Sequence, residues 1–256
     1  EIQTARRDHE ERLKALEARM ARGEQPTDLE AAQARAQAPE DALGLALEPR
    51  IGPLLPATLP PLRWLHVPDT YAITDIGAPG NVDAFLQRLD AALASGLKLV
   101  QFREPGWPGG ADDEGLHQVL KQVVARARSV GARVLVNSIH PHGWIADADG
   151  VHLRAADIPA QRPALPPGAM LSVSAHDAAE LERARQLDAD FAVLAPVLPT
   201  RSHPGQPGLG WETFATLALH AGLPVLALGG QSADTRAAAV AHGAHGIAGI
   251  SGFWGG

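Results

Sequence analysis

The sequence lacks cysteine, and it has no long apolar segment. Without a single Cys in 256 residues, the chain forms no disulfide, binds no metal through thiolates and uses no Cys nucleophile. This composition agrees with a reducing compartment, so we expect a cytoplasmic protein. No run of about 18 consecutive apolar residues is present, and no signal peptide opens the sequence, so we expect no membrane segment. The first residue is Glu1 rather than Met, which leaves room for an upstream segment.

Positive charge is also scarce. The 22 Lys and Arg residues are outnumbered by 29 Asp and Glu residues, which gives a net charge of −7. Proteins that neutralise nucleic-acid phosphates usually show the opposite balance, so we expect no nucleic-acid partner. Hydrophobic residues make up 45% and charged residues 20% of the chain, as is typical of a globular protein.

The composition changes near residue 68. Residues 1–63 contain no Phe, Tyr or Trp, and the first 45 are rich in Ala, Glu, Arg and Gln. Apolar spacing predicts helices over about 3–23 and 28–38, with a capping box at Thr27–Glu30. We therefore expect a charged helical arm at 1–48, a proline-rich linker at 49–68 and a folded domain at 69–256. The arm is interpreted as solvated or loosely docked, with a partner-binding or coiled-coil role as the alternative.

From Tyr71 onward, short apolar runs alternate with amphipathic segments. Eight runs predict strands: Tyr71–Thr74, Leu97–Arg103, Arg133–Asn137, Gly150–Leu153, Met170–Ser174, Phe191–Ala195, Pro224–Leu228 and Gly246–Ile250. Five intervals predict helices: Asn81–Ser95, Asp113–Val130, Ala178–Leu187, Trp211–Ala221 and Asp234–His242. The intervals after the third and fourth runs are weak and contain several prolines.

This alternation indicates an α/β fold with a parallel sheet, because parallel neighbours need crossover connections. Eight units predict a small (β/α)8 TIM barrel, while a doubly wound open sheet is the alternative. Only Ser251 and the residues Gly252–Gly256 follow the eighth run. The barrel is therefore expected to lack its last helix.

In such a barrel the active site lies at the C-terminal ends of the strands. Every predicted strand here ends in polar residues or glycines. At the end of the second run, Arg103 can grip a phosphate or a carboxylate, and Gln101 can hydrogen-bond a heterocycle or a phosphate. The alternative for Arg103 is an interior salt bridge to Glu104 or Asp75.

The seventh and eighth runs end in groups suited to phosphate. Gly229 and Gly230 offer bare backbone amides before a helix, and Ile250 and Ser251 follow the last strand, where barrels often complete a phosphate site. The loop Pro199–Gly205 is rich in hydroxyl groups and is expected to fold over an anionic ligand. A tight turn and an ordinary surface loop are the alternatives.

Three further polar residues lie near predicted strand ends or within a strand. Asp157 is a candidate oxygen ligand for Mg²⁺, and helix N-capping is equally compatible with its position. His152 lies inside an apolar run, which favours a buried interior histidine. His176 lies next to Asp177, which is expected to cap the following helix.

These residues resemble the thiamine phosphate synthase/TenI family, in family order and spacing over about 71–254. The segments that carry the resemblance are Tyr71–Asp75, Val100–Glu104, Val136–Asn137, Ala148–Leu153 with Asp157, Ser172–His176, Ala195–His203, Leu228–Gly230 and Gly246–Ser251. The resemblance implies a synthase that joins hydroxymethylpyrimidine pyrophosphate to thiazole phosphate, with Mg²⁺ as cofactor and small phosphorylated heterocycles as ligands. Whether the chain forms a homo-oligomer is left open.

The resemblance also implies roles for individual residues. Gln101, Arg103 and Asn137 would hold the pyrophosphate-bearing substrate, Asp157 would bind Mg²⁺, Ser174 would lie near the leaving group, Thr200 and Ser202 would contact the thiazole phosphate, and Gly230 with Ser251 would complete its cradle. Arg103, Ser174 and His203 are the candidate catalytic residues.

The sequence departs from the synthase pattern at three positions. Pro105 and His203 stand where the family has lysines, and Ser138 stands where it has an aspartate. Fixed charge is thereby lost at an anionic site, because histidine is cationic only part of the time at neutral pH. Two alternatives follow: a non-catalytic phosphate-ligand-binding or regulatory domain, and an aminothiazole tautomerase of the TenI branch.

The linker carries a second resemblance. Residues Pro53–Leu65 are similar to the join in fusion proteins that place a MutT-type Nudix hydrolase before a TenI-like barrel. The Nudix box is absent from all 256 residues. Nudix 8-oxo-dGTP diphosphatase activity is therefore expected only with an upstream domain outside this chain.

Overall fold

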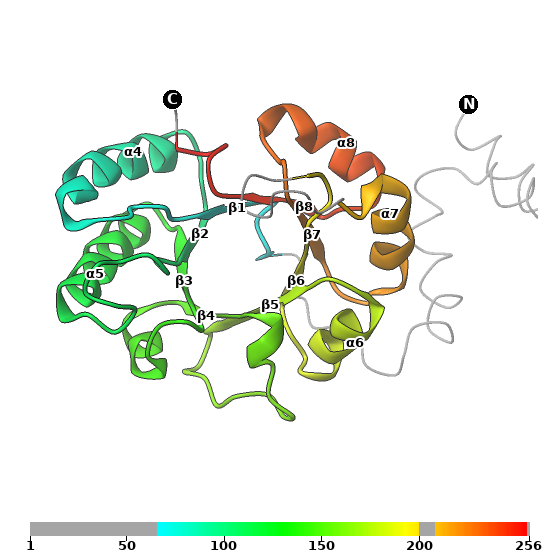
Figure 1. Cartoon of the computed structure of the whole chain (residues 1–256), viewed down its shortest axis with the longest axis horizontal. Helices are drawn as coiled ribbons and strands as arrows, with labels where there is room; N and C mark the ends of the chain where they lie inside the picture. The colour runs from blue at the N-terminus through cyan, green and yellow to red at the C-terminus, as the bar shows by residue number, and fades with distance from the viewer. Residues whose placement is uncertain (1–65, 200–207, 255–256) are drawn as a thin grey trace, which may run out of the picture. The chain divides into compact units, whose positions relative to one another are not determined.

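The domain is a closed barrel of eight parallel strands. The computed structural model describes residues 66–199 and 208–254, so the predicted arm and nearly all of the linker lie outside it. Strands β1 to β8 follow one another around the ring in sequence order, and β8 pairs with β1 (Figure 1). The barrel prediction is confirmed, and the open-sheet alternative is wrong.

The elements lie close to the predicted positions. The strands are β1 Thr70–Ile73, β2 Leu99–Phe102, β3 Arg133–Asn137, β4 Gly150–Leu153, β5 Met170–Ala175, β6 Phe191–Leu194, β7 Val225–Leu228 and β8 Gly246–Gly249. The α-helices are α4 Val82–Ala94, α5 Glu114–Ser129, α6 Ala178–Gln186, α7 Gly210–His220 and α8 Arg236–Ala241. Short 3-10 helices are η2 Pro79–Asn81, η3 His142–Asp147, η4 Ala155–Asp157 and η5 Ala233–Thr235.

The two weak intervals are short 3-10 segments, as their prolines suggest. Only η3 follows β3, and only η4 follows β4. No helix follows β8 in the part of the chain that the structure describes, which confirms that prediction. Instead, the Trp254 ring lies with its centroid 5.0 Å from that of Phe85, and its indole nitrogen donates to the Ile73 carbonyl at 2.9 Å.

Aspartate side chains cap the N-termini of two of the α-helices. The Asp113 carboxylate accepts from the Leu116 amide at 2.9 Å and caps α5. Asp177 caps α6 in the same way through the Glu180 amide, as expected. Each cap satisfies an amide that the helix leaves unpaired, which typically contributes about 1 kcal/mol.

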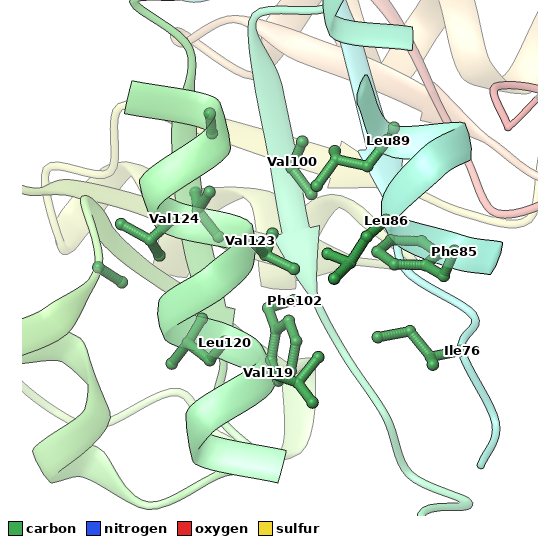
Figure 2. Packing of buried hydrophobic residues seen from close by; sticks show 14 of the residues in the cluster. Ile76, Phe85, Leu86, Leu89, Val100, Phe102, Val119, Leu120, Val123 and Val124 are labelled. Atoms are coloured by element: carbon green, nitrogen blue, oxygen red, sulfur yellow. The ribbon is translucent and has the colours of Figure 1, made fainter. Parts of the chain in front are cut away.

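The core forms two layers on either side of the strands. The barrel interior is filled by Val67, Tyr71, Leu99, Leu135, Met170, Phe191, Val193, Leu226 and Ala248. The outer layer packs the helices against the outward-facing side chains of the strands. Figure 2 shows this layer at β2, where Val100 and Phe102 meet side chains of α4 and α5 such as Leu86 and Val123. Among the described residues, none of the helices is long and apolar enough to cross a bilayer.

Replacing Phe85 with Ala tests the outer layer. Phe85 is fully buried against Trp254, so the substitution leaves a cavity and should lower the free energy of unfolding by about 3–5 kcal/mol. Leu219→Ala is the control, because Leu219 is 80% exposed and should change it by no more than about 0.5 kcal/mol. Urea denaturation measures both. Similar small losses in the two variants would contradict this packing.

Candidate functional site at the barrel mouth

The strand register places polar residues of β2, β3 and β4 at one level. Phe102 is paired with Val136, so Arg103 follows β2 beside Asn137, the last residue of β3. Asn137 is in turn paired with His152 on β4. Because the strands are parallel, these residues all lie at the C-terminal end of the barrel, which we call the mouth.

Two buried amides form the floor of the mouth. The Asn137 side-chain nitrogen donates to the Gln101 side-chain oxygen at 2.8 Å, and the Asn137 oxygen accepts from the Ile139 amide at 3.0 Å. Both residues are only 2% exposed. The bond to Asn137 orients the Gln101 amide, since its oxygen must face Asn137 and its nitrogen must point elsewhere.

Arg103 is half-buried at the mouth, and its side chain is unpaired among residues 66–199 and 208–254. Its backbone is fixed, because the amide donates to the Thr74 hydroxyl at 2.9 Å. The expected alternative, a salt bridge to Glu104 or Asp75, does not form, although both carboxylates lie near enough to act on the charge of Arg103. The Glu104 carboxylate instead accepts from the backbone amides of Ile76 and Gly77 at 3.0 Å. The Arg103 guanidinium therefore remains available to an anion.

The charge of Arg103 affects its neighbours. Burial lowers the pKa of Arg103, the nearby charge of Arg154 lowers it further, and the carboxylates of Glu104 and Asp75 oppose the shift in part. The pKa of His152 is lowered to about 3, chiefly by burial and then by Arg103. The pKa of His140 is lowered by burial, and Arg103 adds to this shift although a backbone hydrogen bond opposes it. The mouth thus favours negative charge in a ligand and neutral histidines in the protein.

His152 links two serines of β5. One ring nitrogen, Nδ1, lies 2.6 Å from the Ser172 hydroxyl, and the other, Nε2, lies 2.8 Å from the Ser174 hydroxyl. A neutral ring donates through one nitrogen and accepts through the other. His152 is buried, as its place in an apolar run predicted. Its hydrogen bond fixes the position of the Ser174 hydroxyl, and Ser174 is the partly exposed member of this hydrogen-bonded row.

Tyr71 lies beneath these groups. Its hydroxyl is buried and has no partner in hydrogen-bond geometry within the described residues. Burial raises the pKa of Tyr71, while Ser172 and Gln101 lie near enough to oppose that rise in part. No pattern in the sequence indicated this unsatisfied hydroxyl.

Asp157 is held by an ion pair. The Arg154 guanidinium donates to both carboxylate oxygens, at 2.5 and 2.9 Å, and the Ser138 hydroxyl donates to one of them at 2.6 Å. These hydrogen bonds, led by those from Arg154, hold the pKa of Asp157 below its ordinary value. Asp157 belongs to η4 and caps no α-helix. Arg154 was missed in the sequence, although its place directly after β4 was a signal.

This arrangement does not fit a Mg²⁺ site. Both oxygens of Asp157 are engaged by a cation already, and the neighbouring position holds Ser138, a neutral hydroxyl. Within the described part of the chain, no three His, Asp or Glu side chains are grouped so that they could hold a metal ion. The Mg²⁺ role of Asp157 stays a prediction from the resemblance.

The loops after β7 and β8 lie against each other on another part of the rim. A Cβ on Gly252 would come 2.9 Å from the Gln231 carbonyl, which shows how closely the two loops approach. Gly230 has a φ of +65°, and a Cβ there would meet Leu198 at 2.9 Å. The backbone amides of Gly230 and Ser251 donate to no group that the structure describes. They are therefore available to a phosphate.

Some of the predicted site residues are hydrogen-bonded to one another or to a neighbour in the mouth, and others are not. Gln101 with Asn137, and Ser174 with His152, are in hydrogen-bond contact. Gly229, Gly230, Ile250 and Ser251 lie on the β7–β8 side, and no hydrogen bond between described residues joins them to Arg103. Thr200, Ser202 and His203 lie outside the described residues.

Comparison with known proteins identifies the family. Residues 70–253 match the model of the TMP-TENI family, described as thiamine monophosphate synthase. The chain belongs to this family. The second resemblance, to Nudix fusion proteins, stays a prediction, because residues 53–65 lie outside the described part.

Several relatives carry related names. The chain is 33% identical over 167 residues to a putative thiamine-phosphate synthase 2 of Aquifex aeolicus, a match that covers 65% of this chain and 87% of that protein. It is 34% identical over 171 residues to the thiamine-phosphate synthase of Thermosynechococcus vestitus, a match that covers 66% of this chain and only 46% of the relative. The chain thus spans about half the length of some relatives.

A solved structure supports the fold. The thiamine phosphate pyrophosphorylase from Pyrococcus furiosus superposes with a TM-score of 0.59 and 23% identity, over 73% of this chain and 88% of that one. At this identity the likeness supports the barrel fold.

The buried His152 should make stability depend on pH. Its pKa falls from 6.5 in the unfolded chain to about 3 in the native protein, so between these values only the unfolded state binds the proton. The free energy of unfolding should therefore fall as pH is lowered through this window, by about 1 kcal/mol per pH unit. Urea denaturation from pH 6 to pH 4 measures the slope.

The variant His152→Gln isolates this contribution, because it cannot take up the proton. Its free energy of unfolding should fall less steeply over the same range. Equal slopes for the two proteins would show that His152 is not held neutral.

Proposed function

We propose that this chain is a thiamine phosphate synthase-like transferase, which joins hydroxymethylpyrimidine pyrophosphate to thiazole phosphate and releases pyrophosphate. The observation that carries the proposal is the unpaired guanidinium of Arg103, next to the linked amides of Gln101 and Asn137, at the mouth of a barrel of this family. Small phosphorylated heterocycles are therefore the proposed ligands.

In this reaction the bond between the pyrimidine methylene and the pyrophosphate oxygen breaks, and its electron pair leaves with pyrophosphate. The thiazole nitrogen then donates its pair to the methylene carbon. Stabilising the departing negative charge and positioning the nitrogen supply most of the catalysis. Arg103 would bind the leaving group bidentately, and Ser174, held by His152, would donate a hydrogen bond to it.

The remaining residues are proposed to position the two substrates. Gln101 and Asn137 would hydrogen-bond the pyrimidine substrate, since their side chains are preorganised by each other. Gly229, Gly230, Ile250 and Ser251 would receive the thiazole phosphate through backbone amides. Thr200, Ser202 and His203 would contact the same side, with His203 supplying charge when protonated.

A second candidate is a barrel that binds a phosphorylated ligand without synthase turnover, or that acts as a TenI-type aminothiazole tautomerase. The observation that favours it is the occupied carboxylate of Asp157, together with the neutral Ser138 beside it. Because the Asp157 carboxylate is already bound by Arg154, the reaction described above uses no step on Mg²⁺. A cytoplasmic location is proposed from the absence of cysteine.

Arg103→Ala tests the proposed transferase. Purified full-length protein is supplied with both substrates and Mg²⁺, and pyrophosphate release is followed. The native chain should release pyrophosphate, and the variant should lose about 100-fold in kcat/KM, as when one preorganised charge-stabilising donor is removed.

Arg126→Ala is the matched control. Arg126 is a partly exposed arginine in the last turn of α5 that pairs with Asp90, away from the mouth, and its loss should change kcat/KM less than twofold. No pyrophosphate release by the native chain at high enzyme concentration would remove the synthase proposal. Isomerisation of the aminothiazole substrate would then support the tautomerase.

A further inference from the structure

Arg154 is built into the mouth in a defined position. It directly follows β4, and its backbone amide donates to the Ser138 hydroxyl at 3.0 Å. Ser138 is itself fixed, because its amide donates to the His152 carbonyl at 2.8 Å. The guanidinium uses Nε and one terminal nitrogen to hold Asp157. The donors on its other edge remain for another acceptor, since guanidinium has five N–H groups.

A second guanidinium lies near this pair. Arg154 is close enough to Arg103 for its charge to lower the pKa of Arg103 after the larger effect of burial, while the carboxylates of Glu104 and Asp75 oppose the shift. Asp157 neutralises one of the two cations, and Arg103 has no salt bridge among the described residues. The side chain of Arg154 is 47% exposed, so its free edge is open to a ligand. A phosphate group placed here would relieve the repulsion between the two guanidiniums.

We propose that Arg154, held in place by Asp157 and Ser138, binds phosphate oxygens together with Arg103, so that this mouth binds its anion without Mg²⁺. Asp157 then acts as a positioning residue that orients the guanidinium. The ligand class is a compound with a phosphate or pyrophosphate group. The inference rests on the proposed function only in taking the mouth as the place where such a group binds.

The charge balance explains why a guanidinium can take this role. A Mg²⁺ site needs oxygen ligands that are free to coordinate, usually one or two carboxylates with waters and substrate phosphates. Here one of those carboxylates is replaced by the hydroxyl of Ser138, and the other is bound by Arg154. Arginine binds phosphate through two parallel N–H groups, so it supplies both charge and orientation.

Isothermal titration of the full chain with inorganic pyrophosphate, in excess EDTA and again in Mg²⁺, tests the proposal. Binding should be seen in EDTA, and Arg154→Ala should weaken it at least about tenfold, because a charged hydrogen-bonding partner is lost. Titration with orthophosphate distinguishes a site for one phosphate group from a site that spans two. Either anion supports the inference if binding depends on Arg154.

Arg185→Ala is the matched control. Arg185 forms the same kind of two-bond ion pair, with Glu182 at 2.7 and 2.6 Å, but it lies in the last turn of α6, away from the mouth. Its loss should change the Kd for pyrophosphate less than twofold. A thermal melt of each variant shows whether the barrel is folded.

Asp157→Asn separates the two interpretations of this site. If Asp157 orients Arg154 beside the anion, the Asn oxygen can still accept from the guanidinium while the negative charge is gone, so pyrophosphate binding in EDTA should be kept or tightened, by up to about fivefold. If Asp157 is a metal ligand, the variant should weaken binding in Mg²⁺. Binding that requires Mg²⁺, or an unchanged Kd in Arg154→Ala, would overturn the inference. The synthase assay is independent of these titrations, so failure of turnover and failure of metal-free binding are distinguishable.

Discussion

The closure of the sheet, through the pairing of β8 with β1, is the constraint on which the rest of the structure depends. Because all eight strands run parallel in one ring, every strand end reaches the same rim. An open sheet would separate Arg103 after β2 from Gly230 after β7 by most of its width. Closure needs a filled interior, and the apolar side chains around Phe191 and Leu135 provide it. The packed interior thus fixes where the polar residues meet.

Charge at the rim is distributed differently from the pattern that the family resemblance implies. Pro105 and Ser138 remove a cation and a carboxylate from that pattern, whereas Arg154 adds a cation that Asp157 holds in place. Arg103 forms no salt bridge among the described residues, although the carboxylates of Glu104 and Asp75 lie near enough to act on its charge. Burial lowers the pKa of both His152 and His140, and the charge of Arg103 adds to each shift. His152 is thereby kept neutral, and a neutral ring can exchange hydrogen bonds with both Ser172 and Ser174.

Much of the fold could be predicted from the sequence, because strands that are buried on both faces read as apolar runs. Arg133–Asn137 and Gly150–Leu153 were predicted to the residue, and Asp177 was recognised as a helix cap. The site was less predictable. Position at the end of a strand identified Arg103 and Gln101 as residues of the mouth, but it could not show that Glu104 turns to the amides of Ile76 and Gly77. Nor could it show the Arg154–Asp157 pair, since either side chain has several rotamers and partners within reach. Such choices depend on three-dimensional packing and competing charges.

The central claim is that one electropositive mouth receives the phosphate groups of the ligand. A crystal structure of the full chain grown with inorganic pyrophosphate in EDTA tests it most directly. Pyrophosphate density should lie within hydrogen-bond distance of the guanidiniums of Arg103 and Arg154. Density only at other surfaces, or pyrophosphate at the mouth with Arg154 turned away from it, would show that the two arginines do not bind the anion together.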